Sequence, residues 1–331
     1  MDRHILVVGG AGYIGSHMCK QLAQSGYTPV VLDNLSRGHR AAVQWGPLVT
    51  GEADDPKTLD RVFTSYPIEA VMHFAAFAYV GESVEHPDRY YRNNMAAALG
   101  LLEAMVRHKV MRFIFSSTCA IYGEPEAVPI PESHPQAPIN PYGWTKKVVE
   151  QMLADFRTAY GLESVSLRYF NAAGADPDGE IGEDHDPETH LIPLVLQTAL
   201  GQRQDIAIFG DDYPTPDGTC IRDYVHVNDL AAAHLTALER LLADQPGGQY
   251  NLGNGTGYSV REVIDTARSV TGREIPTRIV PRRPGDPARL IGAADKARRD
   301  LGWQPAYPDL TAIIETAWRW HSTHPSGYGG R

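Results

Sequence analysis

The chain has 331 residues, of which 43% are hydrophobic and 21% charged, so it can bury the core of one large or two modest globular domains. A formal net charge of −10 argues against nucleic acid or an anionic membrane surface as the main partner. Three widely separated cysteines exclude a disulfide framework and paired metal ligands, and favour a reducing compartment.

The N-terminal sequence HILVVGGAG lacks the basic, apolar and cleavage regions of a signal peptide. No uninterrupted apolar run approaches the length of a membrane span. We therefore expect a cytoplasmic protein that does not enter a membrane.

Short apolar runs alternate with longer amphipathic stretches in the first half of the chain. The runs predicted to be strands are 5–8, 29–33, 70–75, 112–117 and 164–170. The stretches predicted to be helices are 13–26, 90–109 and 142–161. Strands separated by crossover helices form a parallel sheet covered on both faces. This order predicts an α/β protein with a Rossmann-like doubly wound parallel sheet.

The amino-acid composition changes from about residue 176, where Pro, Gly and Asp become frequent. Shorter helices are predicted at 191–200, 227–242 and 259–270. We interpret residues 1–175 as the first domain, with a segment near 223–243 returning to it. Residues 176–331 are interpreted as a smaller C-terminal α/β lobe.

Glycines follow the first predicted strand in GGAGYIG, which places Gly9, Gly12 and Gly15 three residues apart. Such glycines permit a tight strand-to-helix turn, at which a pyrophosphate can approach the free N–H groups of the helix. A purely structural turn would give the same pattern. Because a strand precedes the glycines and a helix follows, we favour a dinucleotide site.

The second strand ends in Asp33, 18 residues after Gly15. A carboxylate at this place can accept both ribose hydroxyls of an adenosine and would repel a 2′-phosphate. The pattern therefore predicts NAD rather than NADP. Arg37 and Arg40 follow closely and would favour a phosphate, which leaves NADP as the alternative.

A helix begins within PINPYGWTKK, where Asn140 suits an N-cap and Pro141 the first helical position. Its first turn carries Lys146, although a cation is unfavourable near a helix N-terminus. Lys146 follows Tyr142 by four residues and shares its helix face. Either Tyr142 packs inward while Lys146 is solvated, or Lys146 keeps a tyrosine proton labile.

Eight motifs together resemble a known family. GGAGYIG, LDNLSRGH, HFAAFAYVGES, FSSTCAIYGE, NPYGWTK, LRYFNAAG, GTCIRDYVHV and PRRPGD occur in the order found in extended short-chain dehydrogenases/reductases. They are most similar to the UDP-glucose (UDP-galactose) 4-epimerases, and the resemblance covers nearly the whole chain. It implies 4-epimerisation of a UDP-sugar by transient oxidation at C4 with a tightly held NAD.

The resemblance implies a catalytic Tyr-x-x-x-Lys pair, matched by Tyr142 and Lys146. A free tyrosine has a pKa near 10, and lowering it by about three units requires roughly 4 kcal/mol of differential stabilisation. We expect Lys146, the nicotinamide and the helix N-terminus to supply it. Thr118 is implied to hydrogen-bond the sugar 4-hydroxyl and relay its proton.

Ser116, Ser117 and Thr118 could instead satisfy backbone groups at a strand end. We apply that interpretation to Ser117 and expect Ser116 to face the nicotinamide. Related 4,6-dehydratases carry an Asp-Glu pair after the position of Thr118. Cys119 and Ala120 stand there and can act neither as acid nor as base, so dehydration is disfavoured.

The resemblance also implies which residues hold each ligand. For NAD they are Gly9, Gly12, Tyr13, Ile14, Gly15, Asp33, Asn34, Ser36, Gly38, Glu52, Ala53, Phe74, Ala75, Ala76, Asn93, Ser116, Tyr142, Lys146 and Tyr169. For the UDP-sugar they are Thr118, Tyr142, Asn171, His190, Leu191, Ala207, Phe209, Arg222, Arg283, Asp286 and Leu290. The arginine forks suit the diphosphate, and the Asp286 carboxylate suits the ribose hydroxyls.

Two positions bear on the choice of sugar. His190 replaces an asparagine, and Leu290 leaves intermediate room for an N-acetyl group. UDP-pentose and UDP-N-acetylhexosamine 4-epimerases are therefore alternatives, as is an NAD-binding sensor without turnover. His185 and His190 lie among acidic residues in GEDHDPETH, which we interpret as a solvated loop rather than a metal site. The resemblance implies a homodimer formed by helices 88–108 and 141–160, with ordinary core packing as the alternative.

Overall fold

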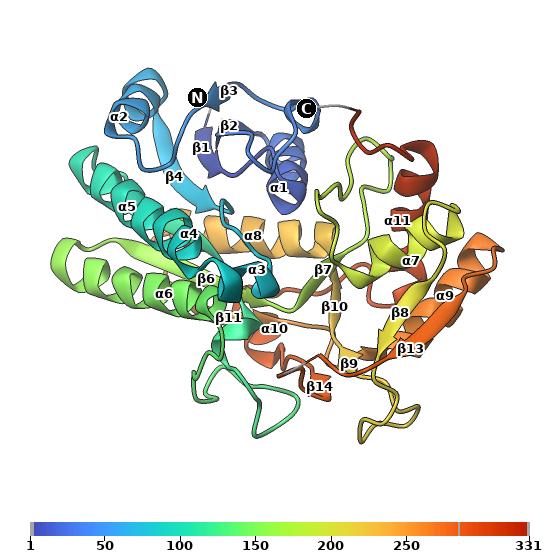
Figure 1. The fold of residues 1–331 in the computed structure, drawn as a ribbon. Helices are drawn as coiled ribbons and strands as arrows, with labels where there is room; N and C mark the ends of the chain where they lie inside the picture. Colours follow the sequence, from blue (N-terminus) through green and yellow to red (C-terminus); the bar gives the residue numbers. More distant parts are fainter. Residues whose placement is uncertain (1–2, 284, 330–331) are drawn as a thin grey trace.

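A seven-stranded sheet forms the centre of the computed structural model, which describes residues 3–283 and 285–329. All neighbouring strands in this sheet are parallel (Figure 1). Their spatial order is β11 (Gly248–Leu252), β6 (Glu163–Tyr169), β5 (Arg112–Thr118), β4 (Ile68–His73), β1 (Arg3–Val8), β2 (Tyr27–Asp33) and β3 (Leu48–Thr50). The chain runs outward from β1 to β3 and then resumes at β4 on the other side of β1. The predicted doubly wound parallel sheet is confirmed.

Each strand of the sheet sends alternate side chains to opposite faces. Ile5 and Val7 of β1 join one buried cluster, while Leu6 and Val8 join the other. The helices on the first face are α1 (Tyr13–Gln24), α8 (Val227–Leu242) and α10 (Asp295–Leu301). Those on the second face are α2 (Pro56–Ser65), α5 (Ala97–Arg107) and α6 (Pro141–Tyr160). Burial on both faces explains why these strands are continuous apolar runs.

The helix predicted at 90–109 is divided into three parts. It comprises α4 (Pro87–Tyr90), a π-helical turn η2 (Tyr91–Ala96) and α5. Such turns alter the direction of side chains within a helix and are frequent at functional sites. The remaining short elements of the first half are η1 (Arg40–Ala42), α3 (Val80–Glu85) and η3 (Cys119–Ile121).

The second lobe has its own apolar core, formed mainly by three helices and by short strands. The helices are α7 (Leu191–Ala199), α9 (Val260–Thr271) and α11 (Leu310–Thr323). The strands form three small sheets: β7 (Asn171–Ala173) with β10 (Tyr224–His226), β8 (Ile206–Phe209) with β13 (Thr277–Val280), and β9 (Ile221–Arg222) between β12 (Tyr258–Ser259) and β14 (Arg289–Leu290). Trp320 of α11 is buried and Trp318 packs against the core.

The second half of the chain returns to the first sheet through three elements. Helix α8 packs beside α1, β11 adds a parallel strand next to β6 (Figure 1), and α10 packs on the same face as α8. The returning parts therefore include residues 248–252 and 295–301 as well as the stretch near 223–243, while the division into two lobes at residue 175 stays an interpretation. Within residues 3–283 and 285–329, no helix is long and apolar enough to cross a membrane.

Because three of its histidines are buried, we expect acid to destabilise the fold. Burial lowers the pKa of His73 and His226 to about 3 and that of His234 to about 4. An unfolded histidine binds its proton near pH 6.5, so below that pH the unfolded chain binds more protons than the native one. As the pH is lowered, the free energy of unfolding decreases by about 1.4 kcal/mol per histidine for each pH unit, until the pKa of the folded state is reached. We expect the free energy of urea unfolding to decrease steeply from pH 6 to pH 5.

A variant isolates one contribution to this acid effect. His234→Gln removes a titrating group while leaving a side chain that can donate to the Leu230 carbonyl, as the His234 ring does at 2.8 Å. Its unfolding free energy should fall by about 1.4 kcal/mol less per pH unit than that of the natural protein. An identical pH slope for the two proteins would rule out His234 as a source.

Candidate active site

The carboxyl ends of the parallel strands carry the predicted cofactor and catalytic residues. Gly9 follows β1, Asp33 ends β2, Phe74 follows β4, Thr118 ends β5 and Tyr169 ends β6. In an open parallel sheet these ends share one edge, and ligands bind there at the point where strand order reverses. That point lies between β1 and β4, where the Phe74 N–H donates to the Val8 carbonyl at 2.8 Å.

The glycines of the first turn serve two different purposes. A Cβ atom on Gly9 would lie 2.4 Å from the Ala75 nitrogen, and one on Gly15 only 2.2 Å from the Gly9 oxygen. These two glycines permit close packing of the chain against itself. A Cβ atom on Gly12 would meet only the Gly9 oxygen, at 3.4 Å, so internal packing does not require this glycine.

Gly12 is also the N-cap of α1, and no side chain caps the helix there. The first turn carries no acidic residue, so its N–H groups and the positive end of the helix dipole can serve a pyrophosphate. A glycine that leaves space beside an uncapped helix N-terminus fits the approach of a dinucleotide.

Two alanine substitutions distinguish a glycine needed for packing of the chain from a glycine needed for binding of the pyrophosphate. Gly15→Ala should destabilise the protein by about 1–3 kcal/mol, because its methyl group meets backbone. Gly12→Ala should leave the melting temperature of the NAD-free protein unchanged, yet lower the NAD carried through purification about tenfold or more, because its methyl group meets the pyrophosphate. Calorimetry and the absorbance of NAD released on denaturation check both results. Undiminished NAD in Gly12→Ala would contradict this placement of the pyrophosphate.

The predicted adenosine end of the site is ordered by Asp33. Its carboxylate accepts from the Ala11 N–H at 3.0 Å and from the Leu35 N–H at 2.8 Å. Asn34 donates to the Glu52 carboxylate at 2.9 Å, which links the ends of β2 and β3. These bonds hold Asp33 and Glu52 at the strand edge, where acceptors for ribose and adenine are expected.

Arg37 and Arg40 do not present a joint phosphate site. Arg37 donates to the Asp186 carbonyl, forms an ion pair with Glu82 at 3.4 Å, and lies 5.2 Å from the Tyr79 ring centroid. Arg40 reaches the Thr50 hydroxyl at 3.4 Å. Because these contacts occupy the Arg37 guanidinium, it is not free to bind a 2′-phosphate. The geometry therefore favours NAD over NADP, as was predicted from Asp33.

The helix that carries Tyr142 and Lys146 begins at Pro141 as predicted, although Lys146, its sixth residue, lies in the second turn rather than the first. The Asn140 side chain accepts from the Gly143 N–H at 2.9 Å, and Pro141 occupies the first helical position. Lys146 is only 3% exposed, and its ammonium group donates to the Ser116 carbonyl at 2.7 Å. The interpretation of Lys146 as a solvated residue is therefore wrong.

The pKa values of Tyr142 and Lys146 differ from those expected from the sequence. Burial raises the pKa of the Tyr142 phenol to about 12, although a hydrogen bond with the Thr118 side chain lowers it. Burial likewise lowers the pKa of Lys146 to about 7. The protein alone therefore favours the neutral form of Tyr142 and brings Lys146 close to half-protonation at neutral pH. Nearby positive charges favour the phenolate, but burial removes its solvation and thereby favours the neutral phenol.

Three consecutive hydroxyls at the end of β5 have three different partners. Ser116 shares a hydrogen bond with the Tyr169 hydroxyl. Thr118 accepts from the Ala120 backbone N–H at 3.1 Å and also bonds the Tyr142 phenol. Ser117 donates to the Glu150 carboxylate at 2.6 Å. Ser117 is structural, as expected, although its partner is a buried side chain rather than the backbone.

Asn94 is a positioning residue that the sequence analysis missed. Its side chain accepts from the Phe77 N–H at 2.8 Å and donates to the Phe77 carbonyl at 2.9 Å, while Asn93 donates to it at 2.9 Å. These two hydrogen bonds to the Phe77 backbone fix the segment that follows Phe74, Ala75 and Ala76. The only sequence signal was the Asn-Asn pair itself.

The predicted substrate residues of the second lobe divide into pairs. Arg222 forms an ion pair with Asp286, and the Arg283 guanidinium lies 3.9 Å from the Phe209 ring centroid. Leu290 of β14 lies beside Arg222 of β9, and Ala207 shares β8 with Phe209. Arg222 and Asp286, which sequence reasoning assigned to separate parts of the nucleotide, thus contact each other directly.

Asp223 is a second positioning residue that was missed. Its buried carboxylate accepts from the backbone N–H groups of Asn254, Gly255 and Gly292 at 2.8, 3.2 and 3.1 Å. Its carbonyl accepts from the Asn171 side chain at 2.8 Å. Asp223 therefore orients Asn171 and joins three loops. An aspartate directly after Arg222 was its only sequence signal.

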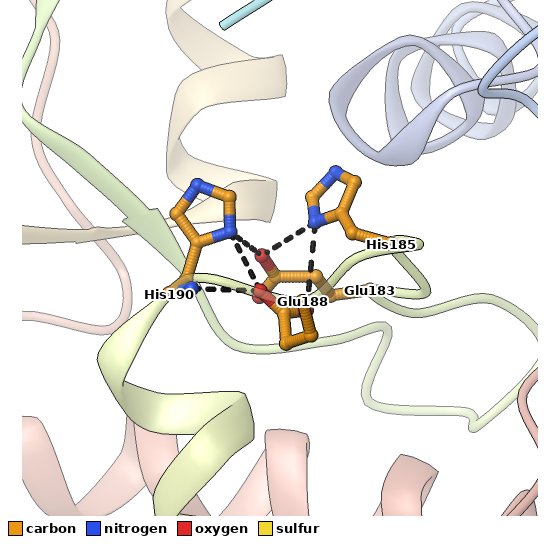
Figure 2. A group of neighbouring side chains, drawn as sticks. All are labelled: Glu183, His185, Glu188 and His190. Carbon is orange, nitrogen blue, oxygen red and sulfur yellow. Dashed lines mark hydrogen bonds and ion pairs between the residues drawn. The ribbon is translucent and has the colours of Figure 1, made fainter. Parts of the chain in front are cut away.

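His190 belongs to a group of four side chains, with Glu183, His185 and Glu188 (Figure 2). The segment is a loop in which Asp186, Pro187 and Thr189 are exposed, as expected, whereas Glu183 is buried, so the loop is only partly solvated. Burial opposes the charged imidazoles, but ion pairs with the two glutamates raise the pKa of His185 to about 9. Contact with Glu183 and Glu188 likewise raises that of His190 to about 10. Leu191 follows as the first residue of α7.

Comparisons with known proteins agree with this arrangement. The NAD dependent epimerase/dehydratase family matches residues 5–253. A UDP-glucose 4-epimerase of Halalkalibacterium halodurans is 56% identical over 98% of this chain and 97% of its own length. The crystal structure of a Brucella ovis UDP-glucose 4-epimerase in complex with NAD has a TM-score of 0.94 and 52% identity, covering 96% of this chain and 97% of that one.

A third similar protein is a UDP-glucose-4-epimerase from Stenotrophomonas maltophila, whose structure contains NAD and formylated UDP-arabinopyranose. It has a TM-score of 0.94 and 39% identity, covering 98% of this chain and 99% of that one. The glycine turn, the strand-edge carboxylate, the Tyr142–Lys146 pair and these full-length similarities lead to one conclusion. The chain belongs to the UDP-glucose 4-epimerases of the NAD dependent epimerase/dehydratase family.

Proposed function

We propose that this chain interconverts UDP-galactose and UDP-glucose by NAD-dependent epimerisation at C4. The observation that carries the proposal is the group formed by Tyr142, Lys146 and Thr118 at the edge of the sheet that also holds the glycine turn. Thr118 bonds the Tyr142 phenol, and Lys146 is anchored to the Ser116 carbonyl. A proton-transfer group thus lies beside the site that suits a dinucleotide.

Bound NAD supplies a hydride acceptor and donor for C4 of the sugar. Tyr142 takes the proton of the 4-hydroxyl, relayed by the Thr118 hydroxyl, and returns it after the 4-keto sugar has presented its opposite face. The buried Lys146 ammonium, when protonated, stabilises the phenolate through Coulomb attraction in a site that excludes water. Because oxidation and reduction alternate within one cycle, no net redox partner is needed.

The second lobe holds the UDP portion in this proposal. Arg222 and Arg283 bind the diphosphate through their guanidinium forks. Asp286 accepts from the ribose hydroxyls, and the ion pair that it forms with Arg222 keeps both groups oriented. The other proposed contacts are Asn171, His190, Leu191, Ala207, Phe209 and Leu290.

A UDP-pentose is the second candidate substrate. The relative from Stenotrophomonas maltophila binds formylated UDP-arabinopyranose, and a pentose requires no room beyond C5. The same Tyr142, Lys146 and Thr118 would act on its 4-hydroxyl, so the chemistry is unchanged and only relative rates distinguish the sugars.

The test adds no cofactor at first. Purified protein is incubated separately with UDP-galactose, UDP-N-acetylgalactosamine and UDP-arabinose, and the anomeric protons are followed by NMR. Fastest conversion of UDP-galactose into UDP-glucose is expected. Faster conversion of the pentose would replace the substrate assignment. No conversion of any sugar, even after NAD is supplied, would overturn the proposal in favour of an NAD-binding sensor.

We also propose that the chain forms a homodimer through α5 and α6. The two helices pack side by side, and both contribute to the cluster on one face of the sheet. Their outer surfaces expose large apolar side chains, Leu99 at 39%, Trp144 at 43% and Tyr160 at 54%. Burying these groups would favour association. Sedimentation velocity should give a dimer, and Leu99→Arg should shift it to monomer; a monomeric natural protein contradicts the proposal.

A cytoplasmic location is proposed on the basis of the cysteines. Cys19, Cys119 and Cys220 are all free thiols, which suits a reducing compartment. Fractionation of the source cells checks this assignment, and recovery outside the cytoplasm would contradict it.

A further inference from the structure

Four potential metal ligands converge in the loop that leads into α7. Glu183, His185, Glu188 and His190 follow the spacing E-x-H-x-x-E-x-H, and one ligand atom of each lies within 4.8 Å of the others. Both imidazoles turn Nδ1 toward the two carboxylates, as Figure 2 shows. We name these four residues the quartet.

The distances within the quartet suit a small cation. His185 Nδ1 lies 3.1 Å from a Glu183 oxygen and 3.6 Å from a Glu188 oxygen. His190 Nδ1 lies 3.0 Å and 2.9 Å from oxygens of the same two glutamates. Tetrahedral zinc with bonds of about 2.0–2.2 Å separates its ligand atoms by about 3.3–3.6 Å. Small adjustments would place all four atoms around one ion.

The charge and burial of the two glutamates are also compatible with a cation here. The side chains of Glu183 and Glu188 are 5% and 7% exposed. Within residues 3–283 and 285–329, no lysine or arginine forms an ion pair with either glutamate. Two buried carboxylates require compensation by two positive charges. The two imidazoles, whose pKa values are raised, supply both charges without a metal, and one divalent ion supplies both when the imidazoles are neutral.

A neighbouring acidic cluster shows the contrast. Asp176, Asp178 and Glu180 surround the Lys20 ammonium, at 2.8, 2.8 and 2.6 Å. This cluster already contains its cation, contributed by α1. The quartet combines carboxylates with imidazoles instead, and imidazole nitrogen is a preferred ligand of Zn²⁺ and related transition metals.

We propose that the quartet is a binding site for one divalent transition-metal ion, with Zn²⁺ as the reference ion. Four protein ligands would close a tetrahedral sphere, which is the pattern of a structural site. The His185 ring lies 6.1 Å from that of Tyr13 in α1 and 6.3 Å from that of Tyr79. The ion therefore fixes the loop and the start of α7 close to the glycine-turn helix.

Metal analysis of the holoenzyme tests this site without reference to turnover. Tag-free, NAD-loaded protein is treated with a chelator, dialysed against Zn²⁺, washed and analysed for metal by mass spectrometry. We expect about one zinc ion per chain. With Co²⁺ in place of Zn²⁺, the visible spectrum should show the intense bands of tetrahedral cobalt.

Three variants identify the ligands. Glu183→Gln and His185→Asn should lose most of the bound zinc and the cobalt bands. His108→Asn is the matched control, because His108 Nε2 contacts Asp60 at 2.8 Å in an exposed pair far from the quartet in sequence. This control should keep its zinc. Circular dichroism and NAD content show whether each variant is folded.

Two results would overturn the proposal. Substoichiometric zinc and no cobalt spectrum in the natural protein would mean that the quartet is an ion-pair cluster with protonated imidazoles. Undiminished zinc in folded Glu183→Gln and His185→Asn would place the metal elsewhere. If these variants do not fold, the cobalt spectrum of the natural protein still decides, since only a tetrahedral oxygen–nitrogen site is consistent with the quartet. Metal binding and epimerase activity can fail independently of each other.

Discussion

Replacing Tyr142 with phenylalanine is expected to reduce kcat by about 10²–10⁴-fold, the range typical of a lost general acid–base group. The phenylalanine ring retains the packing of the buried tyrosine and loses only the hydroxyl that bonds Thr118. Stability and NAD content should therefore be almost unchanged. Turnover is measured from the anomeric protons of UDP-galactose, and NAD from its absorbance after denaturation.

Tyr160→Phe provides the control for Tyr142→Phe. Tyr160 is the last residue of the same helix α6, and it is 54% exposed. Its substitution should leave both turnover and NAD content unchanged. If Tyr142→Phe also keeps normal turnover while Tyr160→Phe behaves normally, Tyr142 has no role in proton transfer.

The second large effect is a loss of stability, which we expect when Glu150 is substituted. Arg168 donates to its two carboxylate oxygens at 2.9 and 2.5 Å, and the side chains are only 3% and 6% exposed. Glu150→Ala leaves the Arg168 guanidinium buried without its counter-ion, which costs about 3–5 kcal/mol. We expect urea unfolding to show a loss of that size with an unchanged m-value.

Two further variants show that burial is the cause. Arg157 forms a 2.8 Å ion pair with Glu163 on the surface, with 54% of the arginine side chain exposed. Arg157→Ala should change stability little, because solvent screens an exposed pair. The double variant Glu150→Leu with Arg168→Met should recover most of the lost stability, because no unpaired charge remains. A double variant as unstable as Glu150→Ala would contradict this explanation.

The Glu150–Arg168 pair also positions the residues proposed to transfer the proton. Glu150 lies on α6, one turn beyond Lys146, and it accepts from Ser117 of β5 at 2.6 Å. Ser117 stands between Ser116, whose carbonyl binds Lys146, and Thr118, which bonds Tyr142. The pair therefore joins the helix that carries Tyr142 to the strand that carries Thr118.

The sheet could be predicted from sequence because its signals are local. Five strands in the first half were expected as short apolar runs between amphipathic helices, and β1, β2, β4, β5 and β6 confirm them within a few residues. The last added strand, β11, could not be assigned in this way. Its partner β6 lies far away in the chain, and pairing between distant segments leaves no periodic pattern in either one.

The sequence by itself determined the short-range patterns of the candidate site. The glycine spacing, the carboxylate of Asp33 and the four-residue separation of Tyr142 and Lys146 are short-range patterns, so they can be recognised without a fold. Only the tertiary structure decided what surrounds them. Burial moves the pKa values of Tyr142 and Lys146 toward the neutral forms, Arg222 meets Asp286, and the two carboxylates of the quartet are withdrawn from solvent. Desolvation and contacts between distant segments depend on the whole packed chain, and therefore no local pattern contains them.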